Sequence, residues 1–146
     1  FYLNNFMNIT AEQAGNRFSE KMDLKPYCLG MGGLGLPGDL SSASRFVKAA
    51  FTKMNSVSGD SESESLSQFF HILAAVEQQR GCAKDENGQY EMTVYSSCCN
   101  TDRGIYYYTT YENRQITGVD MYKEDLESCR LISYPLIQGQ QINMQN

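Results

Sequence analysis

The sequence predicts an α+β fold, with a long N-terminal loop, two helices and then an antiparallel meander of strands. Apolar residues recur at helical spacing in two stretches before residue 77. After Gly81 the hydrophobic period becomes that of strands, separated by short turns rich in Gly, Asn and Asp. Residues 1–29 are polar and show neither period, so we expect an irregular surface segment packed on another element.

The two helices are predicted by their caps and apolar stripes. The first follows a glycine-dense stretch, and Ser41 and Ser42 both offer N-caps. Its apolar face holds Phe46, Val47, Ala50, Phe51 and Met54. A polar loop from Ser56 to Ser65 precedes the second helix, and the pair Ser65-x-x-Gln68 resembles a capping box. The second apolar stripe holds Leu66, Phe69, Phe70, Leu73 and Val76.

Four or five strands are predicted after residue 81. Asn87-Gly88 is a strong hairpin signal between residues 82–84 and 90–99. Two further turns separate strands at 105–111 and 115–122. A last strand at 131–137 contains Pro135, so we expect it at a sheet edge or with a bulge.

The central strands are bulky on both faces. Residues 105–108 read Ile-Tyr-Tyr-Tyr, and the partner strand contains Val94-Tyr95. A half-exposed antiparallel sheet alternates apolar and polar residues, so this pattern predicts burial on both faces. Two helices cover only one face, and we interpret the chain as part of a larger layered domain.

Length and charge limit the class of protein. A chain of 146 residues is long enough for one domain with a core. The net charge is −5, and the lysines and arginines form no basic stripe, so we expect no nucleic-acid partner. No apolar run approaches the roughly 20 residues that a membrane-spanning helix needs, so we expect no membrane insertion.

The cysteines indicate a reducing environment rather than a metal site. There is no CxxC pair, and His71 is the only histidine, whereas zinc needs spaced thiolates or histidines. We therefore expect no bound metal, and reduced, mostly packed thiols in a cytosolic protein, with Cys98 and Cys99 on opposite sides of a strand. The cysteines are Cys28, Cys82, Cys98, Cys99 and Cys129.

Three other features favour a structural interpretation over a functional one. Residues 30–35 fit the dinucleotide pattern GxGxxG, but no convincing strand precedes them, so a flexible or close-packed loop is expected. His71 lies beside an apolar stripe and is interpreted as structural. Gly81-Cys82 could be a self-cleavage site that exposes an N-terminal thiol, but Cys82 falls in a turn.

Arg45 is the most informative cation. It falls in the first turns of the first predicted helix, where the helix dipole disfavours positive charge. If Arg45 is buried, something must compensate, such as a carboxylate or a catalytic thiolate. An exposed, salt-bridged arginine is the alternative.

Four segments resemble the choloylglycine hydrolases (bile salt hydrolases) and their relatives the penicillin V acylases. The resemblance runs in order over essentially the whole chain and corresponds to the C-terminal part, rather under half, of a family member. The segments are GLGLPGDLSSASRFV at 33–47, QFFHIL at 68–73, YYYTTYEN at 106–113 and QQIN at 140–143.

The resemblance implies an N-terminal-nucleophile (Ntn) hydrolase, with an αββα four-layer sandwich of which this chain supplies a part. In that family an N-terminal cysteine is the nucleophile, and its own α-amine is the base. Because the chain begins at Phe1, we expect the nucleophile to lie upstream of it. The implied domain is single, with a protruding assembly-type loop at 1–30, a helical layer at 41–80 and antiparallel strands at 81–146.

The resemblance assigns functional residues within this chain. Arg45 matches the family's second active-site arginine, which lies beside the cysteine and helps to hold its reactive form. The loop from Gln78 to Glu86 resembles one that borders the substrate pocket, which makes Gln78, Gln79 and Cys82 candidate pocket residues.

The function expected from the resemblance is hydrolysis of the amide bond between a bile acid and glycine or taurine, without metal or organic cofactor. The full-length enzyme is expected to be a cytoplasmic bacterial homotetramer, and this chain alone to be inactive. Penicillin V acylase is the alternative within the family. A non-catalytic α+β binding module is the alternative of another class.

Overall fold

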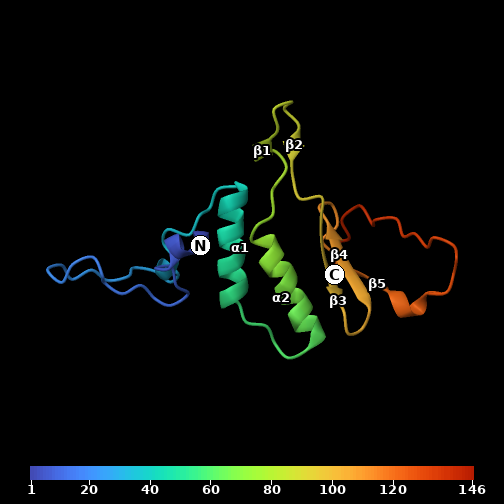
Figure 1. The fold of residues 1–146 in the computed structure, drawn as a ribbon, viewed down its shortest axis with the longest axis horizontal. Helices are drawn as coiled ribbons and strands as arrows, with labels where there is room; N and C mark the ends of the chain where they lie inside the picture. The colour runs from blue at the N-terminus through green and yellow to red at the C-terminus, as the bar shows by residue number, and fades with distance from the viewer. The chain divides into compact units, whose positions relative to one another are not determined.

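A computed structural model describes all residues, 1–146, as two compact units. The first is Phe1–Val76 and contains both α-helices, α1 (Ser42–Asn55) and α2 (Glu62–Ala74). The second is Glu77–Asn146 and contains the five strands. The predicted order, with an irregular segment and two helices before antiparallel strands, is confirmed (Figure 1).

The start of α1 is where the sequence predicts it. Ser41 is the N-cap, and its hydroxyl accepts a hydrogen bond from the backbone N–H of Ser44 at 3.4 Å. Val47 faces inward and is the most deeply buried apolar residue of the helix. In the first unit α1 packs beside α2. Neither helix is long and apolar enough to cross a membrane.

The predicted start of α2 was wrong by one turn. The capping box is formed by Ser61 and Glu64 rather than by Ser65 and Gln68. The Glu64 carboxylate accepts from the backbone N–H of Ser61 at 3.1 Å, and the Ser61 hydroxyl accepts from the N–H of Glu64 at 3.2 Å. A carboxylate also interacts favourably with the positive end of the helix, which an uncharged glutamine does not.

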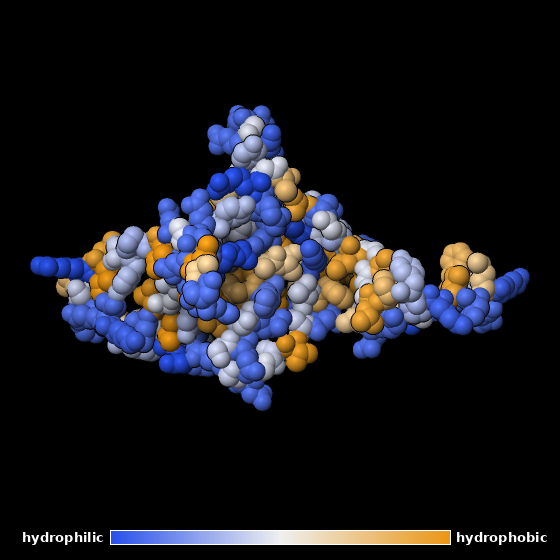
Figure 2. All heavy atoms as spheres, turned by 180° about the vertical axis from the view of Figure 1, so that it is seen from behind, coloured by the Kyte–Doolittle hydropathy of each residue, from blue (hydrophilic) through white to orange (hydrophobic).

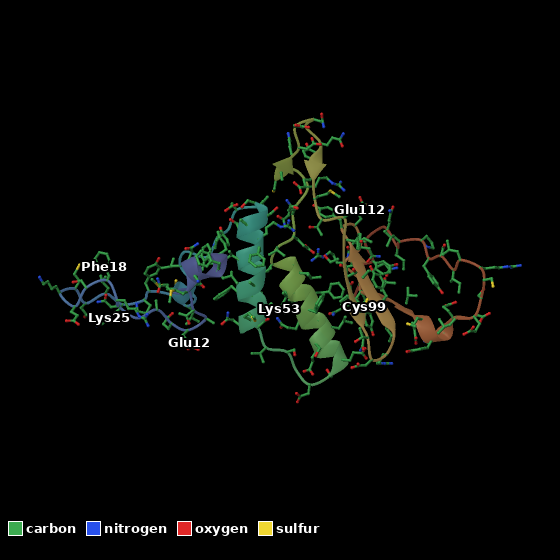
Figure 3. The ribbon with its side chains drawn as sticks, viewed as in Figure 1. Glu12, Phe18, Lys25, Lys53, Cys99 and Glu112 are labelled. Carbon is green, nitrogen blue, oxygen red and sulfur yellow. The ribbon has the colours of Figure 1, made fainter.

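The N-terminal segment is irregular, as predicted, apart from two 3-10 turns at Tyr2–Phe6 and Met31–Gly33. The second turn is fastened where Thr10 N–H donates to the Gly32 carbonyl at 2.9 Å. A Cβ on Gly32 would collide with the backbone of residues 10 and 12. The loop is therefore close-packed at Gly32, whereas a Cβ on Gly30, Gly33 or Gly35 would meet nothing within 4 Å. Between the turns the chain extends into a loop on which Phe18 is 81% exposed (Figure 3).

The predicted hairpin at Asn87-Gly88 is confirmed. Strand β1 (Ala83–Lys84) pairs antiparallel with β2 (Tyr90–Glu91). Gly88 has a φ of +78°, in the left-handed region that glycine adopts without strain. The Asp85 carboxylate accepts hydrogen bonds from the N–H groups of residues 87 and 89 across the turn.

A three-stranded antiparallel sheet forms the rest of the regular structure, in the order β3 (Tyr95–Asn100), β4 (Ile105–Thr110) and β5 (Thr117–Asp120). The predicted strand at 90–99 is divided, because residues 92–94 leave the hairpin before β3 begins. Cys98 lies opposite Tyr107 and Cys99 opposite Tyr106, so the two cysteines face opposite sides of the sheet, as expected.

The predicted last strand at 131–137 was wrong. Residues 131–137 pair with no strand, and hydrogen bonds to side chains of β4 hold the segment instead. The Thr110 hydroxyl donates to the Ile137 carbonyl at 3.1 Å, and the Ile137 N–H donates to the Tyr108 hydroxyl at 3.4 Å. Pro135 has no N–H, which is consistent with a segment that cannot continue a ladder.

Little apolar surface is buried within the chain. Val47 and Tyr108 are the buried apolar side chains, whereas Val94, just before β3, is 60% exposed, and Tyr95 and Tyr106 in the strands are 52% and 40% exposed. Hydrophobic residues lie among hydrophilic ones over the face seen in Figure 2.

We predict that the isolated 146-residue chain does not unfold cooperatively, because the strand residues that the sequence marks as buried remain exposed to water. Thermal unfolding followed by near-ultraviolet circular dichroism should give a broad, featureless curve, and the chain should bind the dye ANS. A sharp two-state transition without ANS binding would support a stand-alone module instead.

Candidate functional site

Arg45 is half-buried on α1, and the end of α2 compensates its charge. Its Nε donates a hydrogen bond of 2.9 Å to the carbonyl of Val76, two residues beyond the end of α2. The C-terminal end of a helix carries partial negative charge on its carbonyls, which stabilises a cation. Neither a carboxylate nor a thiolate of this chain is the direct partner. The two terminal nitrogens of the guanidinium remain available for a ligand.

Asp39 fastens the loop before α1. One carboxylate oxygen accepts from the Ser41 N–H at 2.9 Å, and the other accepts from the Ser44 hydroxyl at 2.5 Å. The side-chain hydrogen bonds from Ser41 and Ser44 lower the pKa of Asp39 from 3.8 to about 2. The carboxylate is therefore ionised at neutral pH and lies at the positive end of α1.

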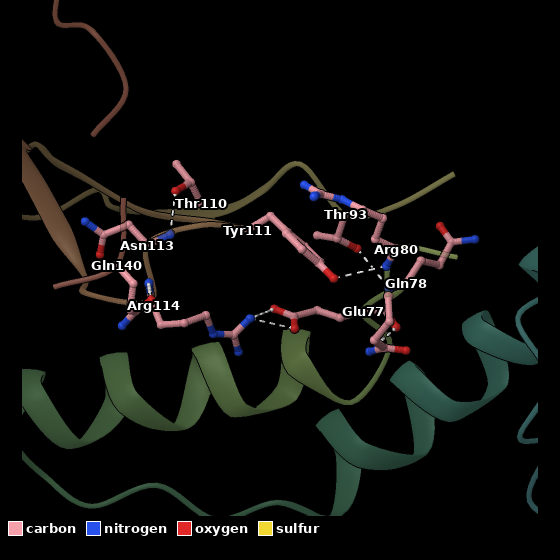
Figure 4. Close-up of polar contacts among 10 residues, drawn as sticks. Glu77, Gln78, Arg80, Thr93, Thr110, Tyr111, Asn113, Arg114 and Gln140 are labelled. Atoms are coloured by element: carbon pink, nitrogen blue, oxygen red, sulfur yellow. Dashed lines mark hydrogen bonds and ion pairs between the residues drawn. The ribbon is translucent and has the colours of Figure 1, made fainter. Parts of the chain in front are cut away.

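Gln78 is positioned by its backbone in the second unit. Its N–H donates to the Thr93 hydroxyl and the Thr93 N–H donates to its carbonyl, each at 3.0 Å (Figure 4). Gln78 is buried, at 7% exposure. The candidate loop is thus tied at its beginning to the segment that follows the hairpin.

Arg80 fastens the middle of the same loop. Its backbone N–H donates to the Tyr111 hydroxyl at 3.1 Å, and its guanidinium lies 5.2 Å from the centre of the Tyr111 ring. The guanidinium also pairs with Glu112 at 3.2 Å. Both side chains of this ion pair are about half exposed, so solvent weakens it and the stacking on Tyr111 matters at least as much.

The turn from Thr110 to Asn113 supports the loop from the other side. Arg114 donates to both carboxylate oxygens of Glu77, at 2.9 and 2.7 Å, and Glu77 is only 17% exposed. Asn113 is 2% exposed, and its N–H donates to the Thr110 hydroxyl at 3.0 Å. The buried Nδ2 of Asn113 has no hydrogen-bond partner, which costs about 1–3 kcal/mol.

Gln79 and Cys82 are exposed, unlike Gln78. The five cysteines are unbridged, but the expectation that most are packed was wrong. Four are exposed, and only Cys98 is partly covered, where burial raises the pKa of its thiol. The thiols lack packing because the strands and loops that carry them lie at the surface.

The supporting residues of the loop were not identified in the sequence. Thr93, Tyr111 and Arg114 are 15 to 37 positions away from the loop residues that they bond. No local pattern marks such pairs. Of the three, only Tyr111 lies in a resembling segment, YYYTTYEN at 106–113, and the resemblance assigns it no role.

The site groups therefore form two separate sets. In the first unit Arg45 presents a guanidinium that can bind an anion or a developing oxyanion. In the second unit the loop at 77–82 presents Gln79 and Cys82 to solvent from a backbone held by hydrogen bonds. Neither set contains a nucleophile bonded to a base.

Comparison with known proteins agrees with the fold. Residues 1–134 match the family described as "Linear amide C-N hydrolases, choloylglycine hydrolase family". The chain is 59% identical over 136 residues to a bile salt hydrolase/transferase of Lactiplantibacillus plantarum, covering 93% of this chain and 42% of that protein. It is therefore less than half as long as this relative.

Solved structures of the family share the architecture. The crystal structure of a variant conjugated bile acid hydrolase from Clostridium perfringens superposes with a TM-score of 0.87 at 36% identity, covering 99% of this chain and 44% of that one. Penicillin V acylase from Agrobacterium tumefaciens gives a TM-score of 0.51 at 20% identity over 60% of this chain and 28% of that one, a likeness of fold alone. The α+β fold expected for part of an Ntn hydrolase is thus confirmed, and the chain belongs to the choloylglycine hydrolase family of linear amide C–N hydrolases.

Proposed function

We propose that this chain is the C-terminal part of an amidohydrolase that cleaves glycine- and taurine-conjugated bile salts. The observation that carries the proposal is the 59% identity to a protein named bile salt hydrolase/transferase, over 93% of this chain. Membership of a family of linear amide hydrolases supports the reaction class. The chain alone is expected to be inactive, because its described sites contain no nucleophile bonded to a base.

The proposed role of Arg45 is to stabilise negative charge at the reacting centre. Its terminal nitrogens are unused, whereas Nε is fixed by the Val76 carbonyl. A guanidinium held in this way can accompany a cysteine thiolate or the oxyanion of a tetrahedral intermediate. The nucleophilic cysteine and its α-amine base are proposed to lie in the preceding part of the full-length enzyme.

The domain assignment is also a proposal. Residues 1–146 would form the C-terminal portion of one choloylglycine hydrolase-like domain, with a helical layer at 41–80 and antiparallel strands at 81–146. The loop with Gln79 and Cys82 exposed would border the substrate pocket, and Gln78 would shape it from a buried position. The hydrogen bonds to Thr93 and Tyr111 support a pocket wall of defined shape.

Assembly and location complete the proposal. Residues 1–30 would form a protruding loop through which a cytoplasmic bacterial homotetramer assembles. The exposure of Phe18 and Tyr27, at 81% and 85%, supports a role in contact with another surface. Five unbridged cysteines are consistent with a reducing compartment.

The role of Arg45 can be tested in a hybrid enzyme in which this chain replaces the matching part of the Lactiplantibacillus plantarum relative. The hybrid should release glycine from glycocholate and taurine from taurocholate. Arg45→Ala should lower kcat by about 100-fold or more, and Arg45→Lys should not restore it, because lysine lacks the planar fork of donors.

Lys53→Ala is the matched control, since it removes a cation from the last turn of the same helix and should leave kcat unchanged. An inactive hybrid, or an active Arg45→Ala variant, would contradict the proposal. Faster cleavage of penicillin V than of either bile salt would favour the acylase. The binding-module alternative predicts no turnover of any of the three.

We predict that substrate protects Cys82 from thiol reagents. In a hybrid whose other cysteines are replaced by serine, taurocholate should slow the labelling of Cys82 by a maleimide several-fold, because the loop would border the occupied pocket. A second variant that keeps Cys129, which is also exposed, serves as the control and should label at an unchanged rate. An equal rate of Cys82 labelling with and without taurocholate would show that Cys82 does not border the substrate pocket.

Gly32 provides a test of the proposed assembly loop. Gly32→Ala places a methyl group against the backbone of residues 10 and 12, so the loop should lose its docking on the turn at Met31–Gly33. Gly33→Ala is the control, because a Cβ there meets nothing within 4 Å. Light scattering of the hybrid should show dissociation of the tetramer for Gly32→Ala only. A tetramer that survives Gly32→Ala would argue against assembly through this loop.

A further inference from the structure

We propose that Asp39 is a positioning residue for Arg45: it fixes the first turn of α1 so that the guanidinium is held against the end of α2. The inference rests on the proposed function, since it assigns Asp39 a role in the same reaction. Asp39 is not proposed to contact the reacting atoms. It acts through its hydrogen bonds to the first turn of α1, which carries Arg45.

The geometry joins Asp39 to Arg45 through two serines. The Asp39 carboxylate bonds both the backbone of Ser41 and the hydroxyl of Ser44, which is itself 8% exposed. The Arg45 N–H donates to the Ser41 carbonyl at 2.9 Å, in the first turn of the helix. Asp39 therefore holds Ser41 and Ser44 by hydrogen bonds, and these two residues set the position of the Arg45 backbone.

Charge gives the same assignment. A cation in the first turn of a helix faces the positive end of the helix dipole, which opposes it. An ionised Asp39 offsets the positive charge at the start of α1, and the Val76 carbonyl, just beyond the end of α2, accepts a hydrogen bond from the guanidinium. The lowered pKa of Asp39, about 2, keeps its charge throughout the neutral range. The cation is thus accommodated by Asp39 at one helix end and by a carbonyl at the other.

The side chain of Arg45 has few other constraints. Its only hydrogen bond in the structure is from Nε to Val76, so the direction of the terminal nitrogens follows from where α1 begins. If the first turn frays, Arg45 moves with it. A displacement of about 1 Å at a catalytic group can cost about 100-fold in rate.

The start of α2 provides a matched control. Glu64 accepts from both the hydroxyl and the N–H of the N-cap Ser61, and these bonds lower its pKa as the corresponding bonds do for Asp39. It lies ten residues before Ala74, the last residue of α2, which is about 15 Å along the helix axis. Glu64→Gln therefore removes a carboxylate charge from a helix start in the same unit, as Asp39→Asn does, without touching the support of Arg45.

The experiment compares Asp39→Asn with Glu64→Gln in the active hybrid enzyme. Both changes should lower the melting temperature by a few degrees, because each removes a carboxylate charge from the positive end of a helix. Only Asp39→Asn should lower kcat, by about 10-fold or more, with KM changed less than about two-fold. The fall should be the same from about pH 5 to about pH 8, where Asp39 is ionised. Equal kinetics for the two variants would overturn the inference.

A double mutant separates positioning from general stability. If Asp39 acts through Arg45, Asp39→Asn should have no further effect on the residual kcat of Arg45→Ala. An additive fall would overturn the inference. If the Asp39→Asn variant does not fold, Ser44→Ala is tested in its place, because it removes one hydrogen bond to Asp39 and no charge. The kcat of Ser44→Ala should also fall. An unchanged kcat would contradict the inference.

Failure of the proposed function and failure of the role of Asp39 would give different results. An active Arg45→Ala variant would contradict the proposed function. An inactive Arg45→Ala variant together with an Asp39→Asn variant that behaves as Glu64→Gln does would leave the proposed function intact and overturn only the role of Asp39.

Discussion

Hydrogen bonds at helix caps and turns hold much of this chain in place, because Val47 and Tyr108 are the only apolar side chains that are fully buried, and the others are partly buried or exposed. A domain normally offsets the entropy of folding by removing apolar surface from water, at about 25 cal/mol per Å². Here that contribution is small within each unit. The conformation of each connecting segment then depends on whether its own polar groups find partners.

The same polar contacts place the candidate functional groups. In the first unit, Asp39 and the carbonyl of Val76 hold Arg45 at two helix ends whose partial charges suit their positions. In the second unit, Thr93 and Tyr111 hold the backbone of residues 78–80, which leaves Gln79 at the surface. Surface ion pairs such as Arg80 with Glu112 add little on their own in water. The hydrogen bonds to the backbone provide most of the order.

Local signals in the sequence were sufficient where one residue or one turn decided the outcome. Ser41 as the N-cap and Asn87-Gly88 as a hairpin are of this kind. The signals failed where two local solutions competed. Two possible capping pairs lie four residues apart, and Ser61 with Glu64 prevailed because a carboxylate satisfies the cap and the dipole together. Residues 131–137 have strand-like composition but are fastened by the hydroxyls of Tyr108 and Thr110.

The sequence by itself determined the α+β class, the order of elements, the family resemblance and the choice of Arg45 as the residue to follow. These depend on periodicity, caps and motifs that are local in the chain. Only the tertiary structure decided that the partner of Arg45 is the carbonyl of Val76, rather than a carboxylate or a thiolate, and that Gln78 is buried while Cys82 is exposed. Contacts between residues 15 to 37 positions apart decide both, and such pairing arises from how the elements pack rather than from any pattern along the chain.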